Sequence, residues 1–173
     1  MALRNIVTVG DAVLTKKCRP VVKFDDRLAQ LLDDMKETMV HANGVGLAAP
    51  QVGILRRVVV VDTGDGIVEL VNPKIVKKSK EQQTGLEGCL SLPGEYGIVT
   101  RPEYVVVRAQ DRTGEWYEYE GEELTARAFC HELDHLDGHL YTEIAERMLT
   151  PEELAEMAAD SEDYEVEIEG EKA

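Results

Sequence analysis

The stretch TARAFCHELDHLD, residues 125–137, decides how the fold of this chain is interpreted. Its apolar residues recur at helical spacing and Gly138 follows it directly, so an amphipathic helix is predicted here. His131 and His135 are four residues apart, which places both imidazoles one turn apart on one face of that helix. Two imidazoles in this arrangement can bind one metal ion, with Glu132 near a water molecule on the ion. The alternative is a helix that carries histidines by coincidence, but a chain with four histidines rarely produces this spacing by chance.

A metal ion held by two histidines needs a third protein ligand. His139 is a poor candidate, because the metzincin pattern would place a histidine two residues later, where this chain has Tyr141. Glutamates of the following segment are a second source, although they resemble capping and surface residues: Glu152, Glu153 and Glu156. Cys89 lies in EGCLS, residues 87–91, where a glycine allows the backbone to approach a ligand closely. A lone cysteine is more often a small buried hydrophobe, but beside a His pair that lacks a ligand, Cys89 is the favoured third donor.

The flanking sequence predicts an α+β domain, because strands dominate its middle and helices lie near both ends. One helix is predicted to begin after the N-cap Asp25 and to end at Asn43-Gly44. Its apolar stripe consists of Leu28, Leu31, Leu32, Met35 and Met39. A C-terminal helix is predicted from the capping box Thr-Pro-Glu-Glu at 150–153 to about Ala159.

Strands are predicted at 57–62, 67–71, 74–80, 97–110 and 115–120. Turns at Asp65-Gly66 and Thr113-Gly114 separate neighbouring strands, and Asn72-Pro73 is predicted to interrupt one. We therefore expect a single compact domain over residues 1–160. In it, antiparallel or mixed β-sheets pack around a central helix that carries the His-Glu-x-x-His motif, with an N-terminal and a C-terminal helix.

The charge of the chain is uneven. The net charge is −15, and the segment from Glu152 to the end holds ten acids against one base. Residues 161–173 have few core-forming side chains and are expected to be a disordered acidic tail. An acidic protein repels phosphates, so direct nucleic-acid binding is not expected. With no apolar run of membrane-spanning length, no signal-peptide core and three cysteines (Cys18, Cys89 and Cys130), we expect a cytoplasmic protein without a membrane partner.

The segment 44–51, GVGLAAPQ, is rich in small residues and directly follows a predicted helix. Taken alone it is a loop with a surface glutamine. Together, GVGLAAPQ, EGCLS and HELDH resemble, in this order, the three signature motifs of peptide deformylases. The resemblance covers about residues 5–150, with further matches at Ile6-Val7, Gly10, Leu14, Arg56, Val58-Val59, Asn72-Pro73 and Ala126-Arg127. Two positions depart from the family pattern: Cys130 replaces a common glutamine, and Pro50 replaces a common threonine.

The resemblance implies a role for each matching residue. It implies the metal ligands Cys89, His131 and His135, and it makes Glu132 the general acid/base. The side chain of Gln51 and the backbone N–H of Leu90 would stabilise the oxyanion. Gly46 belongs to the first motif and would line the site. Our own candidates for the edge that binds the substrate are the segments around Val45, including Gly44, and from Gly94 to Gly97.

The resemblance also implies an activity: metal-dependent removal of the N-terminal formyl group from formyl-methionyl nascent polypeptides, with release of formate. It implies one ferrous ion per chain, with zinc, nickel or cobalt as substitutes, whereas the ligand chemistry alone favours zinc. The substrate would be an extended chain held by strand-like backbone pairing. The ribosome is a further implied partner.

Two other functions fit part of the sequence. A small zinc endopeptidase would use the same His pair, a groove for internal peptide bonds and a third ligand other than Cys89. A non-catalytic peptide-binding module is the second alternative, although degeneration would first remove Glu132, Gln51 or a ligand, and all are present. Asp134 either orients a ligating histidine or is a solvated helix residue. Glu87 and Arg101 are expected to pair beneath the site.

Overall fold

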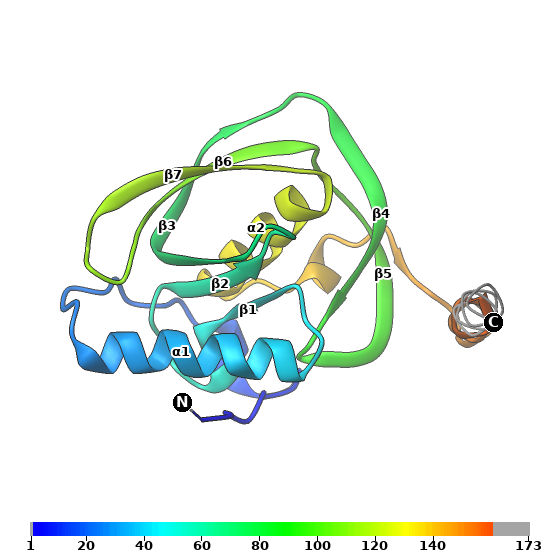
Figure 1. The fold of residues 1–173 in the computed structure, drawn as a ribbon. Helices are drawn as coiled ribbons and strands as arrows, with labels where there is room; N and C mark the ends of the chain where they lie inside the picture. The colour runs from blue at the N-terminus through cyan, green and yellow to red at the C-terminus, as the bar shows by residue number, and fades with distance from the viewer. Residues whose placement is uncertain (1, 161–173) are drawn as a thin grey trace, which may run out of the picture.

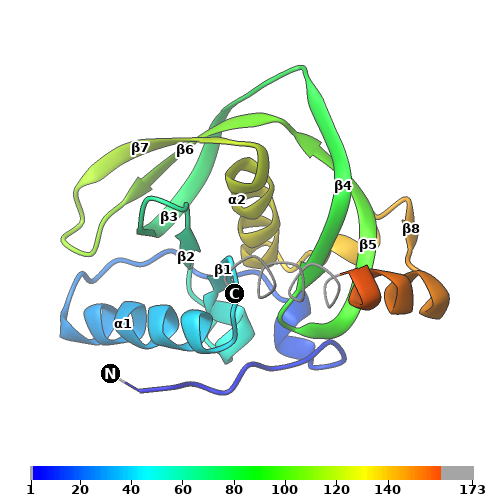
Figure 2. The ribbon, with the colours of Figure 1, turned by 45° about the vertical axis from the view of Figure 1, so that its right-hand side comes forward.

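The structure is a computed structural model and describes residues 2–160. The larger of its two sheets has the strand order β1 (Gly46–Ala48), β2 (Val58–Asp62), β3 (Ile67–Lys78), β6 (Tyr104–Gln110) and β7 (Trp116–Glu122). The smaller sheet has the order β4 (Gln82–Cys89), β5 (Leu92–Pro102) and β8 (Arg147–Met148). The helix α2 (Glu123–Leu136) lies between the sheets, and α1 (Asp26–His41) packs on the other face of the larger one (Figures 1 and 2). The predicted α+β domain around a central helix is therefore confirmed.

The strand β2 connects the two layers, because its side chains alternate between two apolar clusters. Val59 and Val61 face the cluster that contains Phe129 of α2, whereas Val58 and Val60 face the cluster formed with α1. All four valines are fully buried. A strand covered on both faces requires an uninterrupted apolar run, which the four consecutive valines provide.

The predicted helix starts are confirmed by their caps. The Asp25 carboxylate accepts a hydrogen bond from the Leu28 N–H at 3.1 Å, and α1 begins at Asp26. Residues 151–160 are helical, and the Thr150 hydroxyl accepts the Glu153 N–H at 3.2 Å, as a capping box requires. No helix within residues 2–160 is both long and apolar enough to cross a bilayer. The acidic segment 161–173, which was predicted to be disordered, lies outside the described residues.

The end of α1 is a Schellman motif in which Asn43 rather than Gly44 takes the left-handed conformation. The Gly44 N–H donates to the Met39 carbonyl at 2.9 Å, and the Asn43 N–H donates to the Val40 carbonyl at 3.1 Å. The helix ends where it was predicted to end, at Asn43-Gly44. Gly44 also makes room for a neighbouring side chain: a Cβ there would lie 2.6 Å from Cδ1 of Leu90, so that leucine would have to move.

The strands differ from the prediction in several places, and the short strands β1 and β8 were not predicted. The strand β4 was not predicted, and the predicted strand at 97–110 is divided at Glu103 into β5 and β6, which belong to different sheets. The strand β3 runs through Asn72-Pro73 with a shift of register, and Asn72 has a φ of 51°. Its side chain accepts the Val21 N–H at 2.8 Å, so the bulge attaches the N-terminal segment to the sheet. All pairings between the named strands are antiparallel, so no mixed sheet forms among residues 2–160.

Candidate metal centre

The two histidines of α2 lie beside the cysteine that ends β4. The rings of His131 and His135 are 5.0 Å apart between centroids, as the one-turn spacing predicts. The Sγ atom of Cys89 lies 3.4 Å from Nε2 of His135. One donor atom from each of the three residues lies within 4.8 Å of the other two. The structure therefore brings together a thiol and two imidazoles that are distant in the sequence.

A buried carboxylate sets the orientation of the first imidazole. Oε2 of Glu87 lies 2.7 Å from Nδ1 of His131, which leaves Nε2 of that ring for another partner. Arg101 donates two hydrogen bonds to Glu87, at 3.1 and 2.7 Å, and Arg127 donates a third at 3.0 Å. Burial alone would raise the pKa of Glu87, but the hydrogen bonds from His131 and Arg101 outweigh it and lower the pKa to about 2. Glu87 is therefore a carboxylate at neutral pH.

The predicted pair of Glu87 and Arg101 is thus present, and Asp134 joins it from the other side. Oδ2 of Asp134 accepts a hydrogen bond from Nη1 of Arg101 at 2.7 Å. Asp134 consequently positions Arg101 rather than contacting a histidine itself. The contribution of Arg127 was not predicted, because its contact with Glu87 joins residues 40 apart in the sequence.

The protonation states of the two imidazoles bear on whether a metal ion fits here. Burial and the neighbouring His131 lower the pKa of His135 to about 3, so this ring is neutral, which is the form that binds metal. Burial alone would also lower the pKa of His131, but the neighbouring Cys89 and the hydrogen bond with Glu87 raise it to about 10. A divalent cation would replace that proton, because metal binding to a histidine releases protons. One thiolate and two imidazoles match a common ligand set for zinc and similar ions, so the donor set fits a metal.

Glu132 lies beside this cluster and belongs to no complete hydrogen-bond network. Its Oε2 atom is buried without a hydrogen-bond partner among residues 2–160, and Oε1 is 3.9 Å from Nε2 of His131. Burial raises the pKa of Glu132 to about 7. The backbone of β1 passes so close that a Cβ on Gly46 would lie 2.8 Å from Cγ of Glu132. The carboxyl group is therefore held in place and lacks a partner, as expected for a group that receives and returns protons.

Gln51 is buried rather than at the surface, so its interpretation as a surface glutamine is wrong. Only 1% of this residue is exposed. Its Oε1 atom accepts the Ala48 N–H at 3.0 Å, and Nε2 donates to the Ser91 hydroxyl at 3.1 Å and lies 3.5 Å from Sγ of Cys89. Pro50 is the second residue of the short 3₁₀ helix η2 (Ala49–Val52), in its first turn, where the missing N–H costs nothing. The amide group of Gln51 therefore lies within reach of the thiol.

A cleft of about 470 Å³ opens onto this cluster. Of the predicted residues it is lined by Gly44, Val45, Gly46, Cys89, Leu90, Gly94, His131 and Glu132. Gly97 does not line it, because a Cβ there would face the side chains of Met148, Ala145 and Tyr141. Unpredicted lining residues include Leu86, Tyr96 and Leu124, all of which are apolar and exposed. Their sequence positions gave no signal, because single exposed apolar residues are common.

The competing third ligands lie elsewhere. His139 is exposed and pairs with Glu143 at 3.1 Å, and Glu153 forms an ion pair with Arg147 at 2.7 Å. Neither belongs to the Cys-His-His group. A thiol and a helix-borne His pair lie at the base of an open cleft, beside a buried carboxyl group with an oxygen that lacks a hydrogen-bond partner. Together these groups define the class of this protein as a metal-dependent hydrolase.

Comparison with known proteins agrees with this class and identifies a family within it. The polypeptide deformylase family model matches residues 3–150. The peptide deformylase of Agathobacter rectalis is 58% identical over 149 residues, which cover 86% of this chain and 94% of that relative. The peptide deformylase of Caldicellulosiruptor bescii is 55% identical over 154 residues, which cover 89% of this chain and 92% of that relative. The crystal structure of peptide deformylase from Thermotoga maritima has a TM-score of 0.81 at 43% identity, covering 83% of this chain and 97% of that one. This chain therefore belongs to the peptide deformylase family.

Proposed function

We propose that the protein hydrolyses the amide bond between the formyl group and the N-terminal methionine of nascent polypeptides, and so releases formate. One observation supports the proposal independently of family membership. Glu132 is buried and lines the cleft beside the Cys-His-His group, and its Oε2 atom lacks a hydrogen-bond partner within residues 2–160. A carboxyl group in that position can transfer protons to and from a bound amide.

The residues divide the chemistry among them. A divalent ion bound by Cys89, His131 and His135 would supply Lewis-acid activation of water for attack near neutral pH. Glu132 accepts the proton of the attacking water and delivers it to the leaving amine. The Gln51 amide and the Leu90 N–H donate to the developing oxyanion, which is worth about 3–4 kcal/mol per donor in comparable sites. The closeness of Gln51 to Cys89 supports this role.

The substrate is an extended peptide that binds between two strand edges. The strand β1 is at an edge of the larger sheet and β4 is at an edge of the smaller one. Residues of both strands line the cleft, including Gly46 and Gly88. An extended chain can pair its backbone with such edges while neighbouring pockets take its side chains. The exposed apolar groups of Leu86, Tyr96 and Leu124 are suited to the methionine side chain and its neighbours.

For the metal we propose one ferrous ion per chain, with zinc, nickel or cobalt as substitutes. The similarity to the family supports iron, and the mixed sulfur and nitrogen donor set is compatible with all four ions. We also propose that the protein acts in the cytoplasm, on chains that emerge from the ribosome, and that residues 1–160 form the catalytic domain.

The test is a comparison of blocked peptides. The protein is purified without oxygen, its metal is measured, and it is incubated with formyl-Met-Ala-Ser, acetyl-Met-Ala-Ser and an unblocked longer peptide. We expect formate from the first peptide and no cleavage of the other two. Cleavage of an internal bond at a comparable rate would instead indicate an endopeptidase, whose groove must accept chain on both sides of the bond. Loss of activity in air, with activity retained by the nickel form, would support iron.

A further inference from the structure

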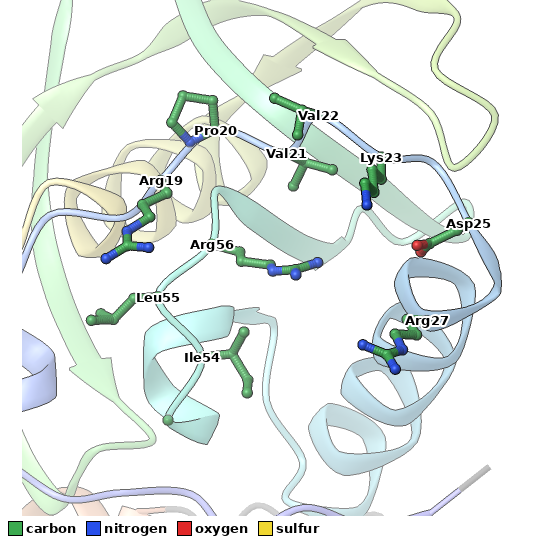
Figure 3. Close-up of a pocket in the computed structure, with 11 residues that line it drawn as sticks. Arg19, Pro20, Val21, Val22, Lys23, Asp25, Arg27, Ile54, Leu55 and Arg56 are labelled. Atoms are coloured by element: carbon green, nitrogen blue, oxygen red, sulfur yellow. The ribbon is translucent and has the colours of Figure 1, made fainter.

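A second cavity, of about 820 Å³, lies beside the N-terminal end of α1. Its lining shares no residue with the cleft of the metal centre. The four cations Arg19, Lys23, Arg27 and Arg56 line it, and we call it the basic cavity. In Figure 3 the side chains of Lys23, Arg27 and Arg56 point toward the same space, and Arg19 lies at the other end.

The basic cavity concentrates positive charge on a chain whose net charge is −15. None of its four cations has an ion-pair partner among residues 2–160. Asp25 is the one carboxylate in the lining, and it accepts the Leu28 N–H as the cap of α1. The positive end of the α1 dipole adds to the same field. An anion entering this cavity would therefore relieve repulsion among like charges.

The wall between the cations is aliphatic. Val21, Val22, Ile54 and Leu55 line the cavity, and 83% of Val22 is exposed. A small anion such as phosphate would neutralise the cations but leave this apolar surface in water. No aromatic side chain lines the cavity, so it offers no surface on which nucleic-acid bases could stack. A ligand that neutralises the cations and also covers the aliphatic wall must carry carboxylates and aliphatic side chains together.

We propose that the basic cavity binds an acidic peptide segment of a partner protein, in which Glu or Asp alternates with Val, Ile or Leu. In an extended segment such side chains point alternately to opposite sides, so one row meets the aliphatic wall and the other reaches the cations. Guanidinium groups bind carboxylates with two parallel hydrogen bonds, which suits Arg27 and Arg56. This contact goes beyond the proposed deformylation, because it uses a surface separate from the metal centre.

The test uses the full chain and a fluorescein-labelled peptide, Glu-Val-Glu-Ile-Glu-Val-Glu, followed by fluorescence anisotropy. We expect saturable binding that weakens about tenfold in each of K23E, R27E and R56E, because each reverses one charge in the cavity. K80E is the matched control, since Lys80 is exposed and does not line the cavity. A peptide with Gln in place of every Glu should bind weakly. Formate release should stay unchanged in all four variants, which verifies that they fold.

Three outcomes would overturn the proposal. One is equal binding of the acidic peptide by the parent chain and all three cavity variants. The second is equal binding of the Gln-containing peptide. The third is tighter binding of oligouridylate than of the peptide, lost in the same variants, which would assign the cavity to nucleic-acid phosphates instead.

Discussion

Glu132 is the residue for which metal binding and catalysis separate most clearly. It stands next to His131 in the sequence and is therefore rotated by about 100° around the helix, away from the direction of that imidazole. We expect Glu132→Ala to keep its fold and its metal while kcat falls by roughly 10²–10⁴-fold, the usual contribution of a positioned acid/base group. Metal analysis and steady-state kinetics on the same preparation check this. Loss of the metal together with the activity would contradict the assignment.

Glu87 links the metal centre to acid stability. Its folded-state pKa is about 2 against an ordinary value of 4.5, so the carboxylate stabilises the fold fully above pH 4.5. That contribution is lost as the pH falls from 4.5 to about 2, because over this range the unfolded state binds a proton at Glu87 and the folded state does not. The shift corresponds to about 3 kcal/mol. In metal-free protein, denaturant unfolding between pH 3 and 7 should show a smaller pH dependence for Glu87→Gln than for the parent chain. Parallel curves for the two proteins would rule out this role.

At the scale of elements, the approach of β1 to α2 sets the position of the acid/base group. A Cβ at Gly46 would lie 2.9 Å from Oε1 of Glu132, so Gly46→Ala should displace that carboxyl group. We expect kcat to fall by roughly 10²-fold, as displacements of about 1 Å in a catalytic site do, with the metal retained. Gly85→Ala is the control, because the nearest atom to a Cβ there is Nη2 of Arg127 at 3.7 Å. Equal losses in the two variants would point to general strand damage instead.

The elements also differ in how well the sequence predicts them. α1 and α2 follow from periodic apolar residues and from recognisable ends, and β2 follows from its run of valines. The strand β4, QQTGLEGC, has two glycines and no apolar alternation, so its extended conformation depends on pairing with β5. The His pair is visible from spacing alone. The placement of Cys89, Gln51 and Glu87 around it depends on tertiary contacts. Cys89 was favoured because the His pair lacks a third ligand, whereas for Gln51 only similarity to a family pointed to the site.

At the scale of the molecule, the residues of the metal centre and the most acidic segment lie in different parts of the chain. All residues assigned to the metal centre lie between positions 44 and 135, whereas the densest acidic segment is 161–173. We expect deletion of residues 161–173 to leave kcat for formyl-Met-Ala-Ser nearly unchanged, because none of the assigned groups is removed. Steady-state formate release from the shortened and full chains checks this. A large loss of kcat in the shortened chain would contradict the view that residues 1–160 form the catalytic domain.

The central claim is that Cys89, His131 and His135 together hold the catalytic ion. Metal stoichiometry tests it most directly, measured on C89A, H131A and H135A beside Q51A after equal exposure to a chelator. Each of the first three lacks one of only three protein ligands and should lose most of its metal. Q51A should keep one ion per chain while kcat falls by roughly 10²–10³-fold through the lost oxyanion donor. A full complement of metal with normal turnover in C89A would contradict the account, as would loss of the metal from Q51A alone.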